Sequence, residues 1–144
     1  MTKFTYILFL SLIFTMFSLD IFASTKECTK QEAIVAEEVI PKISNWIQFK
    51  SYYEQYYHCD DGSIAEGFSE VSANLLIHNW NKEAQKLLYL NSSLKEFVIY
   101  HIDETLLDTQ LKNVKSNLIN TCPENLNDFC KKIILNIESY PSYK

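Results

Sequence analysis

The sequence contains very little glycine and proline and no arginine. Of its 144 residues only two are glycine and three are proline, and all 13 basic residues are lysine. So few turn-forming residues exclude a β fold of many strands and predict a mostly helical chain. The missing arginine and the net charge of −5 argue against a nucleic-acid partner, because phosphate and guanine recognition depend on guanidinium groups.

The chain also lacks an apolar run long enough for a permanent membrane span. A short basic start is followed by apolar residues 4–17, which is fewer than the roughly 20 residues that a bilayer requires, and Asp20 interrupts any extension. A basic start, an apolar middle and a small residue at the junction are the parts of a secretory signal. We therefore predict a signal peptide at residues 1–23, cleaved after Ala23. A single domain at residues 24–144 would follow, periplasmic or secreted, with no stable membrane anchor after cleavage.

Four cysteines lie in the predicted exported part, and none belongs to a C-x-x-C pair; they are Cys28, Cys59, Cys122 and Cys130. The absence of C-x-x-C argues against a zinc ribbon and against a thioredoxin-type redox centre. An even number of cysteines behind an export signal favours disulfides, so we predict two of them. The sequence predicts no cofactor and no metal site.

The predicted fold class is all-α, a small bundle of about five to six helices. Three segments have the form of a capping box, in which a hydroxyl and a carboxylate satisfy free amides at a helix start: 29–32, 63–66 and 93–96. Apolar residues recur at helical spacing in stretches near residues 32–40, 44–57, 64–80, 82–90, 94–101, 106–119 and 127–138.

Two pairings of the cysteines are open. If the first two helices form an antiparallel hairpin that turns at Pro41, Cys28 and Cys59 come close together, and this is the preferred first bridge. Cys122 and Cys130 then pair only if the last helix begins late, with Asn127 as its cap. Eight residues of regular helix rise about 12 Å, whereas a disulfide allows a Cα separation of at most about 7 Å. If Pro123 is the first helical residue, Cys59–Cys122 with Cys28–Cys130 becomes the better pairing.

The densest polar cluster surrounds the Asp-Asp-Gly turn of residues 60–62. Asp60, Asp61 and Glu66 could hold calcium or supply the acid pair of a glycosidase. A calcium loop needs oxygen ligands at alternating positions, which this segment lacks. Helix capping explains every residue of the cluster and is the favoured interpretation, with the acidic site as the alternative.

Histidines are few, and their spacing indicates no zinc site or catalytic motif; they are His58, His78 and His101. In the segment 101–103, Asp103 could orient the His101 imidazole. No nucleophilic serine in a strained turn accompanies the pair. We predict structural or surface roles for all three histidines and assign no catalytic residue.

Four tyrosines lie too close together for one helical face to bury them all; they are Tyr52, Tyr53, Tyr56 and Tyr57. Exposed tyrosine is enriched where proteins bind proteins, so these residues form the candidate interface. The alternative is that they cover the core against Trp46 and Trp80.

Several of these segments together resemble a group of small exported bacterial proteins without assigned function. The resemblance rests on CDDGSIAEGFS at residues 59–69, Leu75-Leu76 and Trp80, and on Phe97-Val98, His101-Ile102-Asp103, Cys122-Pro123 and Cys130. It covers most of the exported part and implies no activity. In its signal peptide, size, helical pattern and internal cysteines, the chain is also similar in style to the periplasmic immunity proteins that protect bacteria from type VI secreted amidases. That likeness carries over no inhibitory residue.

The predicted function is therefore a protein-binding module, such as an inhibitor or immunity protein, with a protein partner of unknown identity. The alternatives are an envelope enzyme that acts on glycan or peptidoglycan, and an envelope stress or assembly factor. A role without catalysis is favoured over an enzymatic one because no catalytic motif is present.

Overall fold

The computed structural model describes residues 26–141, so the predicted signal peptide lies outside the described residues. Within that range the chain forms seven α-helices and three 3-10 helices and no strand: α2 (Lys30–Val39), η1 (Ile40–Lys42), α3 (Trp46–Tyr56), η2 (Tyr57–Cys59), α4 (Gly62–His78), α5 (Lys82–Leu90), α6 (Ser92–Tyr100), α7 (Asp108–Thr121), η3 (Glu124–Leu126) and α8 (Asn127–Ser139). The all-α class is confirmed, with seven α-helices where about five to six were predicted. None of the helices in residues 26–141 combines the length and the apolar composition needed to cross a membrane.

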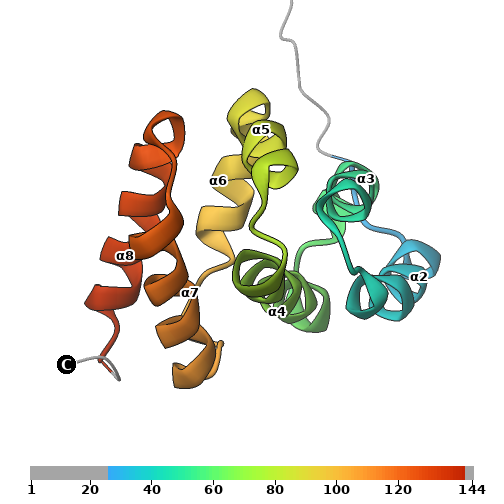
Figure 1. Cartoon of the computed structure of the whole chain (residues 1–144). Helices are drawn as coiled ribbons and strands as arrows, with labels where there is room; N and C mark the ends of the chain where they lie inside the picture. Colours follow the sequence, from blue (N-terminus) through green and yellow to red (C-terminus); the bar gives the residue numbers. More distant parts are fainter. Residues whose placement is uncertain (1–25, 142–144) are drawn as a thin grey trace, which may run out of the picture.

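The helices follow one another across the molecule in chain order. Figure 1 shows α2 and α3 at one end, α7 and α8 at the other, and α4 between them. Helix α4 contacts both α2 and α7, and α6 contacts α8, so the two ends are joined through the centre. Because α4 packs on both sides, its buried residues are spread around more than one face, unlike the single stripe of a surface helix.

An aromatic cluster joins three helices inside the core. Phe49 of α3, Phe68 of α4 and Phe97 of α6 meet with ring centroids 5.9 Å apart for the first pair and 5.0 Å for the second. Phe49 and Phe68 are fully buried. Such edge-to-face pairs contribute roughly 0.5–1.5 kcal/mol each beyond the burial of their area.

Only the first of the three predicted capping boxes is present. The Thr29 hydroxyl accepts from the Glu32 amide, and the Glu32 carboxylate accepts from the Thr29 amide. The boxes predicted at residues 63–66 and 93–96 are wrong. Helix α4 begins one residue before Ser63, with Asp61 as its cap, and α6 already includes Ser92 and has no side-chain cap.

Both glycines of the chain lie in α4, at positions where a larger residue would be unfavourable. Gly62, the first residue of the helix, has φ +51, a conformation that residues with a Cβ rarely adopt. Gly67, one turn and a half later, lies where an added Cβ would be 3.2 Å from Cγ2 of Ile40 in η1. The first glycine makes the sharp entry into α4 possible, and the second lets η1 approach its backbone closely.

The two disulfides are Cys28–Cys59 and Cys122–Cys130, with Cα separations of 4.8 and 6.4 Å. The preferred pairing is therefore confirmed. Pro123 has an extended backbone and precedes the short η3 turn, so α8 starts only at Asn127. The predicted cap is wrong by one residue: Leu126 is the cap and Asn127 is the first helical residue. This late start is what brings Cys122 within reach of Cys130.

The two bridges close loops of very different length, and this difference predicts their contributions to stability. The chain-entropy model gives about 3.7 kcal/mol for Cys28–Cys59, which spans 31 residues, and about 2.5 kcal/mol for Cys122–Cys130, which spans 8. We expect the double variant Cys28→Ser/Cys59→Ser to lose more free energy of unfolding in urea than Cys122→Ser/Cys130→Ser. The reverse order would mean that packing at the bridges outweighs loop entropy.

Candidate functional site

The most organised polar cluster of the described residues is buried beside α4. The ring of His101, directly after α6, has its Nδ1 3.0 Å from the Ser69 hydroxyl of α4 and its Nε2 3.1 Å from Oδ2 of Asp60. The Ser69 hydroxyl also donates to Oδ2 of Asp103, 2.8 Å away. His101 and Ser69 are each about 1% exposed. The cluster therefore ties α4 to the turn before it and to the end of α6.

The Ser69 hydroxyl links His101 and Asp103 in this network. Its one hydrogen is directed to Asp103, and its oxygen remains as an acceptor toward the ring of His101. The second ring nitrogen of His101 faces the Asp60 carboxylate. Hydrogen bonds to a carboxylate are stronger than those between neutral groups, so both aspartates contribute to holding the serine and the histidine in place.

Serine, histidine and aspartate in mutual contact are also the parts of a nucleophilic triad. Here Ser69 lies in the middle of a regular helix, its hydroxyl hydrogen is directed to Asp103, and its side chain is buried. A nucleophilic serine normally sits on an exposed, strained turn with its hydrogen directed to the base. The geometry of the cluster is that of a buried structural network.

Sequence reasoning identified His101 and Asp103 as a pair but missed the serine. Ser69 lies 32 residues earlier in the chain, and nothing in its helical context distinguishes it from other serines. The only available signal was its position on the apolar face of α4, between Phe68 and Val71, where a buried hydroxyl needs a partner.

The predicted acidic site is divided between two hollows. Asp60 and Asp61 line one of about 430 Å³ beside the first disulfide. Glu66 lines another of about 370 Å³ with Ser69, Tyr100, His101, Asp103, Glu104 and Thr105. The structure therefore does not bring Glu66 together with the two aspartates. Asp61 caps α4 by accepting from the Gly62 amide at 2.8 Å, and Asp60 serves His101.

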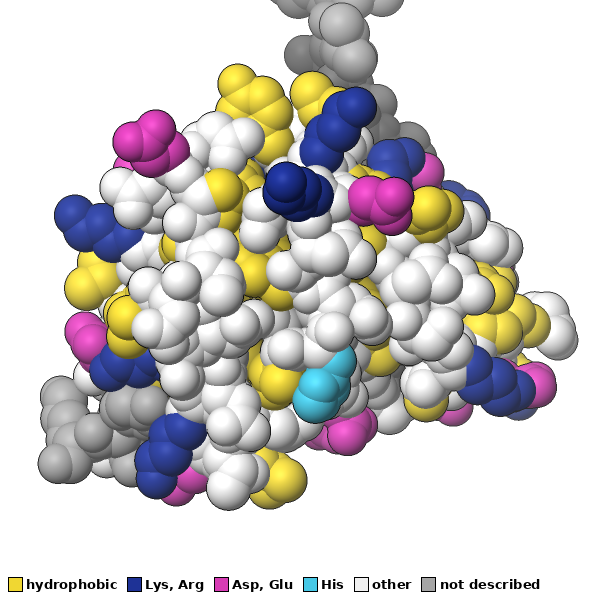
Figure 2. Space-filling view, viewed as in Figure 1, with side chains coloured by type: hydrophobic (Ala, Val, Ile, Leu, Met, Phe, Trp, Pro, Cys, Tyr) yellow, Lys and Arg dark blue, Asp and Glu magenta, His cyan; other side chains and the backbone are white. Residues whose placement is uncertain are grey.

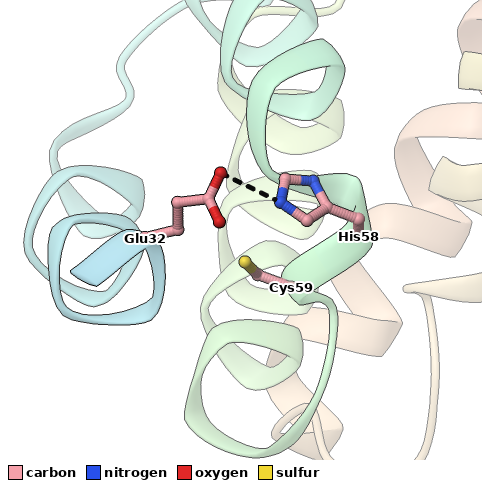
Figure 3. Close-up of side chains that lie close together, drawn as sticks. All are labelled: Glu32, His58 and Cys59. Atoms are coloured by element: carbon pink, nitrogen blue, oxygen red, sulfur yellow. Dashed lines mark ion pairs between the residues drawn. The ribbon is translucent and has the colours of Figure 1, made fainter. Parts of the chain in front are cut away.

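A second polar cluster lies at the start of α2, against the first disulfide. Glu32 Oε1 is 2.6 Å from the Lys26 ammonium and 3.4 Å from Nε2 of His58. Figure 3 shows the Cys59 sulfur near Glu32 and His58. One ligand-type atom from each of Glu32, His58 and Cys59 lies within 4.8 Å of the others. Because Cys59 is bonded to Cys28, its sulfur is not a thiolate and cannot act as an ordinary metal ligand in this state.

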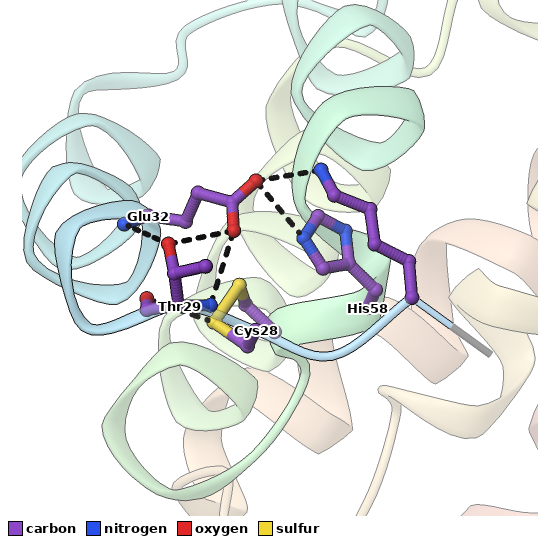
Figure 4. Close-up of a disulfide and its surroundings, with 6 residues drawn as sticks. Cys28, Thr29, Glu32 and His58 are labelled. Atoms are coloured by element: carbon purple, nitrogen blue, oxygen red, sulfur yellow. Dashed lines mark hydrogen bonds and ion pairs between the residues drawn. A yellow bond between two sulfur atoms is a disulfide. The ribbon is translucent and has the colours of Figure 1, made fainter. Parts of the chain in front are cut away.

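The carboxyl of Glu32 is held strongly ionised. Hydrogen bonds from the Lys26 side chain, the Thr29 amide and the Thr29 hydroxyl, in that order, lower the pKa of Glu32 from 4.5 to about 2. Figure 4 shows these contacts converging on one carboxylate beside the disulfide. The residue thus combines a helix cap with a local ion pair.

The four predicted interface tyrosines have different environments. Tyr56 is buried and stacks with half-buried Tyr52 at a ring distance of 6.2 Å. Tyr53 packs on Phe97 at 4.7 Å, and burial raises its pKa. Tyr57 is 55% exposed. Covering the core therefore accounts for Tyr52, Tyr53 and Tyr56, and only Tyr57 presents most of its ring to solvent.

Tyr57 lines one of two separate hollows between α3 and the α5–α6 segment. One hollow of about 450 Å³ lies between the end of α3 and the α5–α6 junction, with Tyr53, Tyr57 and Leu90 in its lining. A second, of about 460 Å³, has Ile47 and Leu87 in its lining. We call these two hollows the α3–α5 groove. Figure 2 shows exposed hydrophobic side chains, in yellow, at the top of the molecule, where α5 lies in Figure 1.

Comparison of the chain with protein-family models, with curated proteins and with solved structures finds no match. The class of the molecule is therefore described from its fold and its sites. It is a small all-helical protein with two disulfides, a buried histidine–carboxylate network and an exposed aromatic groove.

Removing the Ser69 hydroxyl will leave the buried groups of His101 and Asp103 without a partner. We expect Ser69→Ala to lower the free energy of unfolding by about 1–3 kcal/mol in urea titration. The matched control Ser116→Ala, at an exposed position on α7, should change it by less than about 0.5 kcal/mol. Equal stability of the two variants would show that the network contributes nothing to folding.

The low pKa of Glu32 makes part of the stability depend on pH. Because the folded-state pKa lies below the ordinary value, the contribution is complete above about pH 4.5 and is lost as the pH falls toward about 2. We expect Glu32→Gln to be less stable than the parent at pH 7, with the difference closing between pH 4.5 and 2. Thermal unfolding across this range measures it. The control Glu70→Gln, at an exposed position of α4, should follow the parent at every pH.

Proposed function

We propose that this protein is an exported binding module of the inhibitor or immunity class, and that its partner is a protein. The observation that carries the proposal is the α3–α5 groove. Three of its side chains are large, apolar and mostly exposed: Ile47 at 73%, Tyr57 at 55% and Leu90 at 66%.

The groove has the composition of a binding surface. Tyr57 and Leu90 line one of its two hollows, and Ile47 lines the other. Exposed apolar side chains are unfavourable in water, and a partner that covers them stabilises the complex. Tyr57 offers a rigid ring with a polar tip, the type of residue that dominates interface energies. Tyr53 beneath it is fixed against Phe97, so the floor of the groove is ordered before any partner arrives.

Charge suggests which partners would be attracted. The chain carries a net charge of −5, so long-range attraction favours a basic partner. Within the groove itself Lys50 and Glu54 form an ion pair, which leaves the apolar side chains as the main short-range contacts. The association rate should therefore fall as salt rises, while the dissociation rate depends mainly on the aromatic and aliphatic contacts.

Affinity capture with the full chain tests the proposal. The protein is produced from Met1 in an exporting host, and its mass is measured first, with removal of residues 1–23 expected. It is then exposed to native envelope and secreted extract, and each retained enzyme is assayed with and without it. One stoichiometric enzyme that loses activity on binding supports the inhibitor class. Suppressed aggregation of many clients, with no stoichiometric partner, would favour a stress or assembly factor instead.

The groove itself is tested with a pair of tyrosine variants. We expect Tyr57→Ala to weaken the captured complex at least tenfold, measured by surface plasmon resonance, because a central aromatic contact contributes about 1.4 kcal/mol or more. The matched control is Tyr100→Ala, since Tyr100 is also exposed (71%) but lies on α6, outside the groove. Equal affinities of the two variants would place the partner on another surface.

An envelope enzyme that acts on glycan or peptidoglycan is the second candidate. The contact of Ser69 with His101 is the observation that favours it, and Glu66 and Asp103 border the same hollow. Turnover that disappears in Ser69→Ala while the melting temperature is unchanged would support this candidate. Simultaneous loss of stability, as expected above, leaves the binding module as the better proposal.

A further inference from the structure

His58 is a buried histidine whose Nε2 has no hydrogen-bond partner. Its side chain is only 4% exposed, and Nε2 lies 3.4 Å from Glu32 Oε1, outside hydrogen-bond geometry. A buried polar atom without a hydrogen-bond partner is destabilising and uncommon in folded proteins, so the position of this nitrogen calls for an explanation. Figure 3 shows it directed toward the space between the Glu32 carboxylate and the Cys59 sulfur.

The groups around that space are those that bind zinc. Imidazole nitrogen, carboxylate oxygen and cysteine sulfur are its ordinary protein ligands, at roughly 2.0–2.3 Å from the metal. In a tetrahedral shell such ligand atoms lie about 3.3–3.8 Å from one another. The atoms of Glu32, His58 and Cys59 already lie within 4.8 Å of one another, and Cys28, bonded to Cys59, supplies the fourth position.

We infer that reduction of the Cys28–Cys59 bond converts this cluster into a zinc site with Cys28, Cys59, His58 and Glu32 as its four ligands. The reductant is a dithiol, which is itself oxidised to a disulfide as the protein bond becomes two thiols. Zn²⁺ then binds both sulfurs as thiolates, and two protons are released. The inference does not depend on the proposed function, since it concerns the opposite end of η2 from Tyr57.

The polypeptide around the site needs little rearrangement to accept the ion. Cys28 lies directly before the cap of α2, and Cys59 ends η2, so each thiolate is on a fixed segment. Glu32 stays in the first turn of α2, with one oxygen on Thr29. Only the Lys26 ammonium must leave the other oxygen, and its side chain is 60% exposed. Zinc would replace it as the cation that the carboxylate faces.

Metal binding to the reduced full chain tests the inference, with Zn²⁺ and the spectroscopic probe Co²⁺ as the ligands. The second disulfide provides a matched control because its cysteines could also bind metal once reduced. We expect Cys122→Ser/Cys130→Ser, reduced with a phosphine, to bind one equivalent of Zn²⁺ and to give thiolate-to-cobalt charge-transfer bands with the intense d–d bands of a tetrahedral site. Reduced Cys28→Ser/Cys59→Ser should lack this site.

Histidine variants then separate the proposed site from non-specific thiol binding. In the Cys122→Ser/Cys130→Ser background, His58→Gln should weaken zinc at least tenfold and alter the cobalt spectrum. His78→Gln, at an exposed position of α4, should change neither. Circular dichroism follows the helical content throughout. Absence of one-equivalent binding, loss of the helices on reduction with no recovery by zinc, or equal affinity of the two histidine variants would each overturn the inference.

Discussion

The Cys28–Cys59 bond fixes the turn from which both polar clusters are built. Consecutive residues on this turn serve different partners: His58 faces Glu32, Cys59 holds the start of α2, and Asp60 reaches His101. Asp61 then caps α4. Because a disulfide leaves its segments little freedom, the side chains on either side of Cys59 keep their directions. The disulfide thus reinforces the entry into α4, which the Asp61 cap also holds, and α4 is the helix at the centre of the molecule.

The network around His101 connects this turn to the other half of the chain. Asp60 comes from the turn before α4, Ser69 from α4 itself and Asp103 from the α6–α7 connection. Buried ionic groups seldom add much net stability, because their desolvation offsets their attraction. They do penalise every alternative packing that would leave one of them unpaired. The network thus favours one placement of α6 against α4, where apolar contacts alone would tolerate several.

Most of the fold could be predicted from the sequence, but the residues that form the two polar clusters could not. Apolar spacing located α5 at its observed bounds and the other helices within a few residues, because that pattern is local. The capping boxes predicted at residues 63–66 and 93–96 do not form, because side chains in both segments make tertiary contacts instead. Ser63 donates to Glu37, and Glu96 forms an ion pair with Lys132. Ser69 was missed for the same reason. Its role depends on His101, and the fold alone brings the two together.

The polar groups of the His101 network and the apolar side chains of the α3–α5 groove differ in their exposure to solvent. The Ser69 hydroxyl and the His101 imidazole are buried and are hydrogen-bonded to the half-buried carboxylates of Asp60 and Asp103, whereas aromatic and aliphatic side chains line the open α3–α5 groove. Ser69 and His101 already form hydrogen bonds within the fold. The exposed side chains of Tyr57, Leu90 and Ile47 are therefore the ones available to contact a partner. This distribution is what makes a binding module the stronger proposal.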